Sequence, residues 1–171
     1  MPAAFLLHPV VVVSLGIWAL NDHVLKEAWG GWFTGKLSDV VSLMVFPLVA
    51  AAVYEWSMAL MGREPRRTPR VIVGFTVAAA AVMAGINTLE SWAWAYELGL
   101  GAAQWPYYAL KALLLGYPVP GPGRVVLTMD PTDLVTLPSI AFPLWMARRV
   151  AADSRGSGEG ALGPWERGDG R

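Results

Sequence analysis

Long apolar runs dominate this sequence and restrict the folds that it can adopt. Four of them lie at about residues 3–20, 37–61, 71–89 and 131–147. A helix needs about 20 residues to cross the hydrocarbon core of a bilayer, and only helices and closed barrels satisfy their backbone polar groups there. The composition agrees, with 55% hydrophobic residues, 15% charged residues and nine Trp, unlike an average soluble domain. The sequence therefore predicts an all-α integral membrane protein with four transmembrane helices.

The arginines predict the orientation of these spans. They cluster in the link between the second and third spans and directly after the fourth: Arg63, Arg66, Arg67, Arg70, Arg148 and Arg149. Because positively charged loops stay in the cytoplasm, we expect a multi-pass protein of the cell (inner, cytoplasmic) membrane with both termini cytoplasmic. Residues 1–150 would form a single transmembrane domain. The Gly-rich tail, residues 151–171, is expected to be disordered and cytoplasmic.

Residues 98–117, between the third and fourth spans, are apolar enough to form a fifth span. However, polar residues recur at every seventh position before and within this stretch, at Glu90, Glu97, Gln104 and Lys111. This spacing places one polar stripe on a helix whose other faces carry Trp, Tyr and Leu, and Trp and Tyr prefer the membrane interface. We therefore favour an interfacial or re-entrant amphipathic helix over a fifth span, with Pro106 breaking the helix or turning it back.

Two further features limit the partners and the chemistry of the chain. Gly74 with Ala78, and Ala81 with Gly85, have a spacing of small residues that lets helices approach closely in lipid. The third span is therefore a candidate interface with a membrane protein partner or with a second copy of the chain. The chain has no Cys and a net charge of zero. These features exclude disulfides and thiolate metal sites and argue against a nucleic-acid partner.

Three polar blocks, residues 21–26, 34–39 and 130–133, flank the apolar runs and would share the exoplasmic boundary. Ionisable residues at this depth are costly and tend to mark functional sites. The candidate ligand-binding residues are Asn21, Asp22, His23, Lys26, Thr34, Lys36, Ser38, Asp39, Asn87, Glu90, Asp130 and Asp133. No catalytic residue can be assigned among them, because their spacing matches no established catalytic motif.

One interpretation of this cluster is a divalent cation. Asp22, His23, Asp39 and one of Asp130 or Asp133 offer an oxygen-rich shell with one imidazole. Such a shell suits magnesium, calcium or manganese better than structural zinc. A bound cation would be the cofactor of a membrane-embedded hydrolase or transferase that acts on lipid-linked substrates.

Two other interpretations need no metal. Lys36, near a helix N-terminus, would bind the phosphate of a lipid head group together with Lys26. Alternatively, the blocks only cap helices, as Asp130 before Pro131 would. We place a lipid-binding or accessory subunit ahead of the enzyme, because a four-span chain of this size leaves little protein for a closed active site.

The polar blocks also carry a resemblance. The strings NDHxxK at 21–26, TGKLSD at 34–39 and DPTDL at 130–134, with Phe46-Pro47, resemble a group of small bacterial multi-span membrane proteins. The resemblance covers the first 50 residues and the start of the last span, and TGKLSD is its most specific part. It implies that these blocks act as a unit in a multi-span membrane protein, and it implies no particular reaction.

Overall fold

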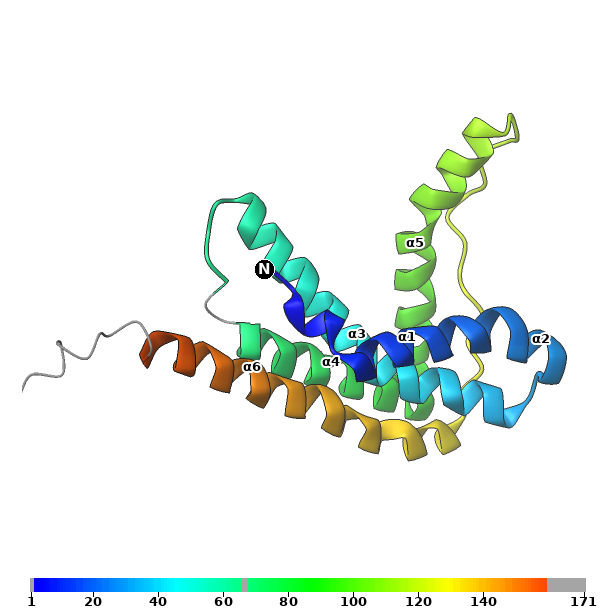
Figure 1. The fold of residues 1–171 in the computed structure, drawn as a ribbon. Coiled ribbons are helices and arrows are strands. Elements are labelled where there is room, and N and C mark those ends of the chain that lie inside the picture. Colours follow the sequence, from blue (N-terminus) through cyan, green and yellow to red (C-terminus); the bar gives the residue numbers. More distant parts are fainter. Residues whose placement is uncertain (1, 66–67, 160–171) are drawn as a thin grey trace, which may run out of the picture. The chain divides into compact units, whose positions relative to one another are not determined.

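A computed structural model describes residues 2–65 and 68–159, with side chains up to residue 153. The described residues form helices and no strand (Figure 1), which confirms the predicted helical class. The elements are η1 (Ala4–Leu7), α1 (Pro9–Leu20), η2 (Asn21–Leu25), α2 (Lys26–Trp29), α3 (Trp32–Leu60), α4 (Thr68–Thr88), α5 (Glu90–Leu114), η3 (Pro131–Ile140) and α6 (Ala141–Glu159). They fold into two compact units: unit 1, Met1–Ala80 with Thr136–Arg171, and unit 2, Ala81–Val135. The sequence does not predict this division of the expected single domain.

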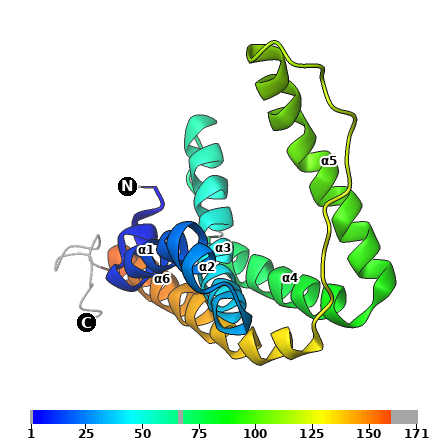
Figure 2. The same ribbon diagram turned by 90° about the vertical axis from the view of Figure 1, so that its right-hand side faces the viewer.

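Unit 1 begins with a helical hairpin in which α1 and α3 lie side by side (Figure 2). The first arm runs from α1 through a π-helical turn, η2, into α2 without a break. The turn back into α3 is made at Gly30 and Gly31. A Cβ at Gly30 would lie 2.7 Å from the carbonyl oxygen of Lys26, so only glycine fits this close approach.

The core of unit 1 collects apolar side chains from η1, α1, α3, α4 and α6. Its buried members are Ala3, Phe5, Val11, Leu48, Ala51, Ala52, Ile72, Met146 and Ala147. One buried acid, Glu55 of α3, lies beside this core and accepts hydrogen bonds from the Thr68 hydroxyl at 2.7 Å and from the Ala3 amide. Glu55 therefore joins α3 to η1 and to the first turn of α4, where the helix dipole favours a negative charge.

Two helices, α3 and α4, are long and apolar enough to cross a membrane by length and composition. They match the second and third predicted spans. Only 39% of the apolar window of α3 and 28% of that of α4 is buried within the protein, so much of their apolar surface faces outward. The helices at the first and fourth predicted spans, α1 and α6, do not meet the same criterion.

The helix at the end of unit 1 overlaps the predicted tail. The tail is predicted to begin at residue 151, and α6 extends to Glu159. Ala151 and Ala152 are strong helix formers and directly continue the helix. The prediction from the sequence considers the glycine content of the whole tail and does not consider these two residues separately. The rest of the predicted tail, residues 160–171, lies outside the described residues.

Unit 2 consists of the end of α4, the long helix α5 and an extended return segment, residues 115–130, which runs back along α5 (Figure 2). The predicted break at Pro106 is wrong, because α5 continues through this residue. A proline inside a helix removes one hydrogen bond and crowds the carbonyl four residues earlier, yet α5 tolerates it at this exposed position. Like α1 and α6, α5 does not meet the criterion for a membrane span.

Candidate functional site

Two of the three polar blocks form one hydrogen-bonded cluster in unit 1, which we call the latch (Asn21, Asp22, Lys26, Thr34 and Ser38). The Asn21 side-chain amide donates to the Thr34 carbonyl at 2.8 Å and to the Ser38 hydroxyl at 2.9 Å. Ser38 in turn donates to Asp22 Oδ1 at 2.7 Å. Lys26 Nζ lies 2.7 Å from the same carboxylate oxygen. The latch therefore ties the end of the first arm to the start of α3.

The π-helical turn η2 positions the latch. It places the neighbours Asn21 and Asp22 so that both reach Ser38, and the Lys26 amide donates to the Asn21 carbonyl across the wider turn. Asn21 is fully buried, and its side-chain carbonyl oxygen has no hydrogen-bond partner among the described residues. Single π-helical turns are rare and often occur at functional sites. The sequence motif does not predict this turn.

The electrostatics of the latch favour an ionised Asp22. Burial raises the pKa of its carboxyl group, but hydrogen bonds from Lys26 and Ser38 and the charge of Lys26 outweigh this effect and lower the pKa below its ordinary value of 3.8. Opposite charges and donors stabilise the charged form of a carboxylate. Asp22 is therefore held as an anion that is already hydrogen-bonded within the protein.

The remaining predicted residues of the first two blocks lie around the latch. The Thr34 hydroxyl caps the start of α3, since it accepts from the Gly31 amide at 3.1 Å and donates to the Gly31 carbonyl at 2.9 Å. Lys36 is buried, with its Nζ 5.5 Å from the centre of the Trp32 ring, a cation–π distance. His23 is exposed, and Asp39 is half-buried on α3.

The third block caps a helix, as one of the three interpretations predicts. Asp130 Oδ1 accepts hydrogen bonds from the Thr132 amide at 2.9 Å and from the Thr132 hydroxyl at 2.7 Å. The Asp130 amide donates to the side chain of Asn87 at 3.0 Å, which joins the return segment to the end of α4. Glu90 is exposed at the start of α5, and Asp133 is half-buried on η3.

The proposed cation ligands are Asp22, His23 and Asp39 in unit 1 and Asp133 in unit 2. The described part of the chain contains no group of three or more His, Asp or Glu side chains placed to hold a metal ion. The Asp22 carboxylate bonds to Lys26 and Ser38 instead. A cation at these residues stays a prediction from the sequence.

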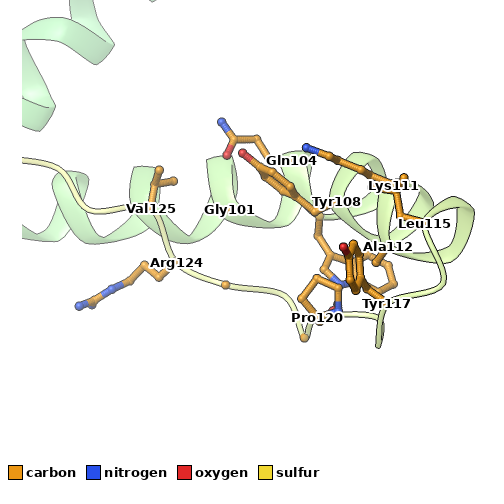
Figure 3. Close-up of a pocket in the computed structure, with 13 residues that line it drawn as sticks. Gly101, Gln104, Tyr108, Lys111, Ala112, Leu115, Tyr117, Pro120, Arg124 and Val125 are labelled. Atoms are coloured by element: carbon orange, nitrogen blue, oxygen red, sulfur yellow. The ribbon is translucent and has the colours of Figure 1, made fainter. Parts of the chain in front are cut away.

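A second site lies in unit 2. The sequence predicts its helix, but none of its lining residues is among the sequence-based candidates. A groove of about 510 Å³ runs between α5 and the return segment (Figure 3). Its polar and aromatic lining comes from Gln104, Trp105, Tyr108, Lys111, Tyr117 and Arg124. Gln104, Tyr108 and Lys111 lie along one edge of the groove, and Tyr117 and Pro120 lie across from them. The spacing of the first three follows one helix face.

The groove is shaped by close contacts between α5 and the return segment. A Cβ at Gly101 would lie 1.9 Å from the Gly123 carbonyl oxygen, so the two backbones touch at one end. The Trp105 indole donates to the Pro120 carbonyl at 2.7 Å. Farther along the chain, the Tyr117 amide donates to the Ala112 carbonyl at 2.8 Å and closes the turn after α5.

Glu97 fixes the return segment beyond the groove. Its carboxylate lies 3.2 Å from the Arg124 guanidinium and accepts from the Leu127 amide at 2.9 Å. Its backbone carbonyl accepts from the Val125 amide at 3.2 Å. Glu97 is therefore an internal anchor, although the sequence places it in a solvated polar stripe. No sequence signal identifies the distant Arg124 as its ion-pair partner.

Within the part of the chain that the structure describes, the fold defines a class: an all-helical protein in which α3 and α4 are long and apolar enough to span a membrane. Comparison with known proteins adds no family, because no family model, curated protein or solved structure matches the chain. The resemblance to small bacterial multi-span membrane proteins therefore stays a prediction.

Proposed function

We propose that this chain is a four-span protein of the cell membrane that binds the head group of a membrane lipid on its exoplasmic side and serves as an accessory subunit. The spans are η1 with α1, α3, α4, and η3 with α6. Both termini are then cytoplasmic, and the groove along α5 is exoplasmic.

The outward-facing apolar surface of unit 1 supports a membrane environment. Large apolar side chains are exposed on three of its helices: Val12, Val13 and Leu20 on α1, Phe46, Val53 and Trp56 on α3, and Phe75 and Val77 on α4. A soluble monomer rarely exposes apolar patches of this extent, whereas lipid tails would cover them without cost.

Adjoining elements lengthen the two spans that do not meet the criterion by themselves. Helical residues run from Ala4 to Leu20 in η1 and α1, with His8 between them. At a rise of about 1.5 Å per residue this stretch is about 26 Å long, close to the thickness of a bilayer core. The fourth span gains length in the same way, because η3 passes directly into α6 at Ala141.

The groove along α5 carries the lipid-binding proposal. Lys111 offers a cation for a phosphate, while Gln104 and the hydroxyls of Tyr108 and Tyr117 offer hydrogen bonds. The Trp105 ring contributes an apolar wall, and Trp and Tyr are the residues that favour the membrane interface. A site with one cation, several hydroxyls and aromatic walls suits a phosphate-bearing lipid head group at that depth.

The latch supports an accessory role over the metal-dependent hydrolase or transferase. The described contacts of Asp22, Lys26 and Ser38 are made with one another, with Asn21 and, for Asp22, also with the Trp18 side chain. These side chains join two helices, and such a use needs no substrate. No observation on the described residues favours the enzyme, so we do not propose it.

Lipid retention tests the groove. The protein is purified in mild detergent with a phosphatidylglycerol of defined chain length, and bound lipid is counted by native mass spectrometry. Tyr108→Ala combined with Lys111→Gln should lower lipid occupancy about tenfold, because it removes a charged hydrogen bond and an aromatic wall.

Leu110→Ala is the control, since Leu110 is exposed on the same helix but does not line the groove. Excess inorganic phosphate serves as a competitor and separates a phosphate site from a lipid site. Equal lipid retention in the wild type, the double variant and the control would overturn the proposal.

A further inference from the structure

A second groove, separate from the latch and from α5, lies within unit 1 between the first turns of α4 and the middle of α6. Its volume is about 410 Å³. The two helices run in opposite directions here (Figure 1). The lining residues are Pro69, Arg70, Val73, Leu144, Ala147, Arg148 and Ala151.

The charged and the apolar lining residues lie at opposite ends of this groove. Because the helices are antiparallel, Arg70 and Arg148 lie toward the same end, and Val73 and Leu144 lie toward the other. Ala147 is buried between them at the core of unit 1. The groove therefore offers two guanidinium groups at one end and an apolar channel at the other.

The two arginines have no ion-pair or hydrogen-bond partner for their guanidinium groups among the residues that the structure describes. The acid that reaches the first turn of α4 is Glu55, which bonds to Thr68 and to the Ala3 amide. Arg149, the neighbour of Arg148, lies instead over the Trp145 ring, with its guanidinium carbon 4.6 Å from the ring centre. The lining of the groove thus includes two cations that have no counter-ion among the described residues.

We infer that this groove binds an anionic phospholipid of the cytoplasmic leaflet. Two guanidiniums can share one phosphate through paired hydrogen bonds, and basic pockets between helices on the cytoplasmic side are suited to acidic lipid head groups. An acyl chain would continue along Val73 and Leu144, which distinguishes a lipid from a soluble anion. The inference rests on the proposed topology, which places both arginines on the cytoplasmic side.

The first test compares the two guanidiniums with their neighbour. The protein is reconstituted in nanodiscs that contain phosphatidylcholine with a small fraction of cardiolipin, and the cardiolipin released with the protein is counted by native mass spectrometry. Arg70→Gln with Arg148→Gln should lower cardiolipin retention at least tenfold. Arg149→Gln removes one positive charge on the same helix outside the groove and should retain cardiolipin within about twofold of the wild type.

A second variant tests the apolar part of the same groove and does not alter charge. Val73→Trp should fill the channel and lower retention of cardiolipin several-fold, with helix content by circular dichroism unchanged. If the arginine variant fails to fold, Val73→Trp decides the question alone. Undiminished retention in a folded groove variant would overturn the inference, as would an equal loss in Arg149→Gln.

Two further experiments complete the test. The first distinguishes a bound lipid from a free anion, and the second distinguishes this groove from the groove along α5. Inorganic phosphate at millimolar concentration should not displace the lipid, because the apolar channel adds affinity that free phosphate lacks; displacement would show an anion site and contradict the lipid assignment. In a protein that already carries the α5 variants Tyr108→Ala and Lys111→Gln, Arg70→Gln with Arg148→Gln should still lower cardiolipin retention at least tenfold. Failure of the exoplasmic site and failure of this one are therefore seen in different variants.

Discussion

Ser38 is the residue on which the latch depends, because its hydroxyl accepts from Asn21 and donates to Asp22. Ser38→Ala removes one hydrogen bond from the buried side-chain amide of Asn21 and one from the carboxylate of Asp22. We expect the free energy of unfolding in detergent to fall by about 1–2 kcal/mol. Ser42→Ala is the control on the same helix, since the Ser42 hydroxyl donates to the Asp39 carbonyl of its own helix and not to a latch residue. Equal effects of the two substitutions would show that the latch adds no stability.

The pH dependence of stability tests the charge on Asp22. Because its pKa is lower in the folded protein than the ordinary 3.8, ionised Asp22 stabilises the fold above that pH, and the stabilisation is lost as the pH falls through the lower folded value. The difference in Tm between the wild type and Asp22→Asn should therefore be constant at neutral pH and shrink below about pH 4. A difference that stays unchanged down to about pH 2 would contradict this assignment.

At the scale of elements, the contact between α5 and the return segment depends on one glycine. Gly101→Ala would place a methyl group 1.9 Å from the Gly123 carbonyl oxygen, so the segment must shift. We expect a loss of about 1–3 kcal/mol in stability and faster proteolysis within residues 115–130. Gly99→Ala, whose Cβ would meet nothing within 4 Å, should be neutral or slightly stabilising in the same assay. Similar protease sensitivity of both variants would show that the close contact is not needed.

The elements also show where sequence patterns succeed and where they fail. Long apolar runs predict α3 and α4 because their length and hydropathy suffice without tertiary information. The predicted break at Pro106 fails because the cost of an internal proline, about 3 kcal/mol, is local, and the sequence pattern does not show that the contacts of the long helix α5 with the return segment can offset it. The π-helical turn at Asn21 is not predictable, since it differs from an α-helix by one residue in one turn, and local propensities do not distinguish the two.

At the scale of the whole molecule, the sequence predicts part of the candidate site. The first two polar blocks meet in the latch through Asn21, Asp22 and Ser38, but these contacts are internal. The groove along α5 and the groove beside Arg70 are missed, because each is formed by residues far apart in the chain. Hydrophobic periodicity identifies which face of a helix is polar, but not which distant segment packs beside it.

The proposed four-span topology places the latch and the α5 groove on the outer side and the arginine groove on the inner side. Because the chain has no Cys, single cysteines can report this topology at four exposed positions: Glu27, Arg63, Gly121 and Ala152. Intact cells are treated with a membrane-impermeant maleimide. Four spans predict labelling at Glu27 and Gly121, and labelling at Arg63 and Ala152 only after permeabilisation. Labelling of Glu27 and Gly121 from opposite sides would contradict this topology, because α5 would then cross the membrane.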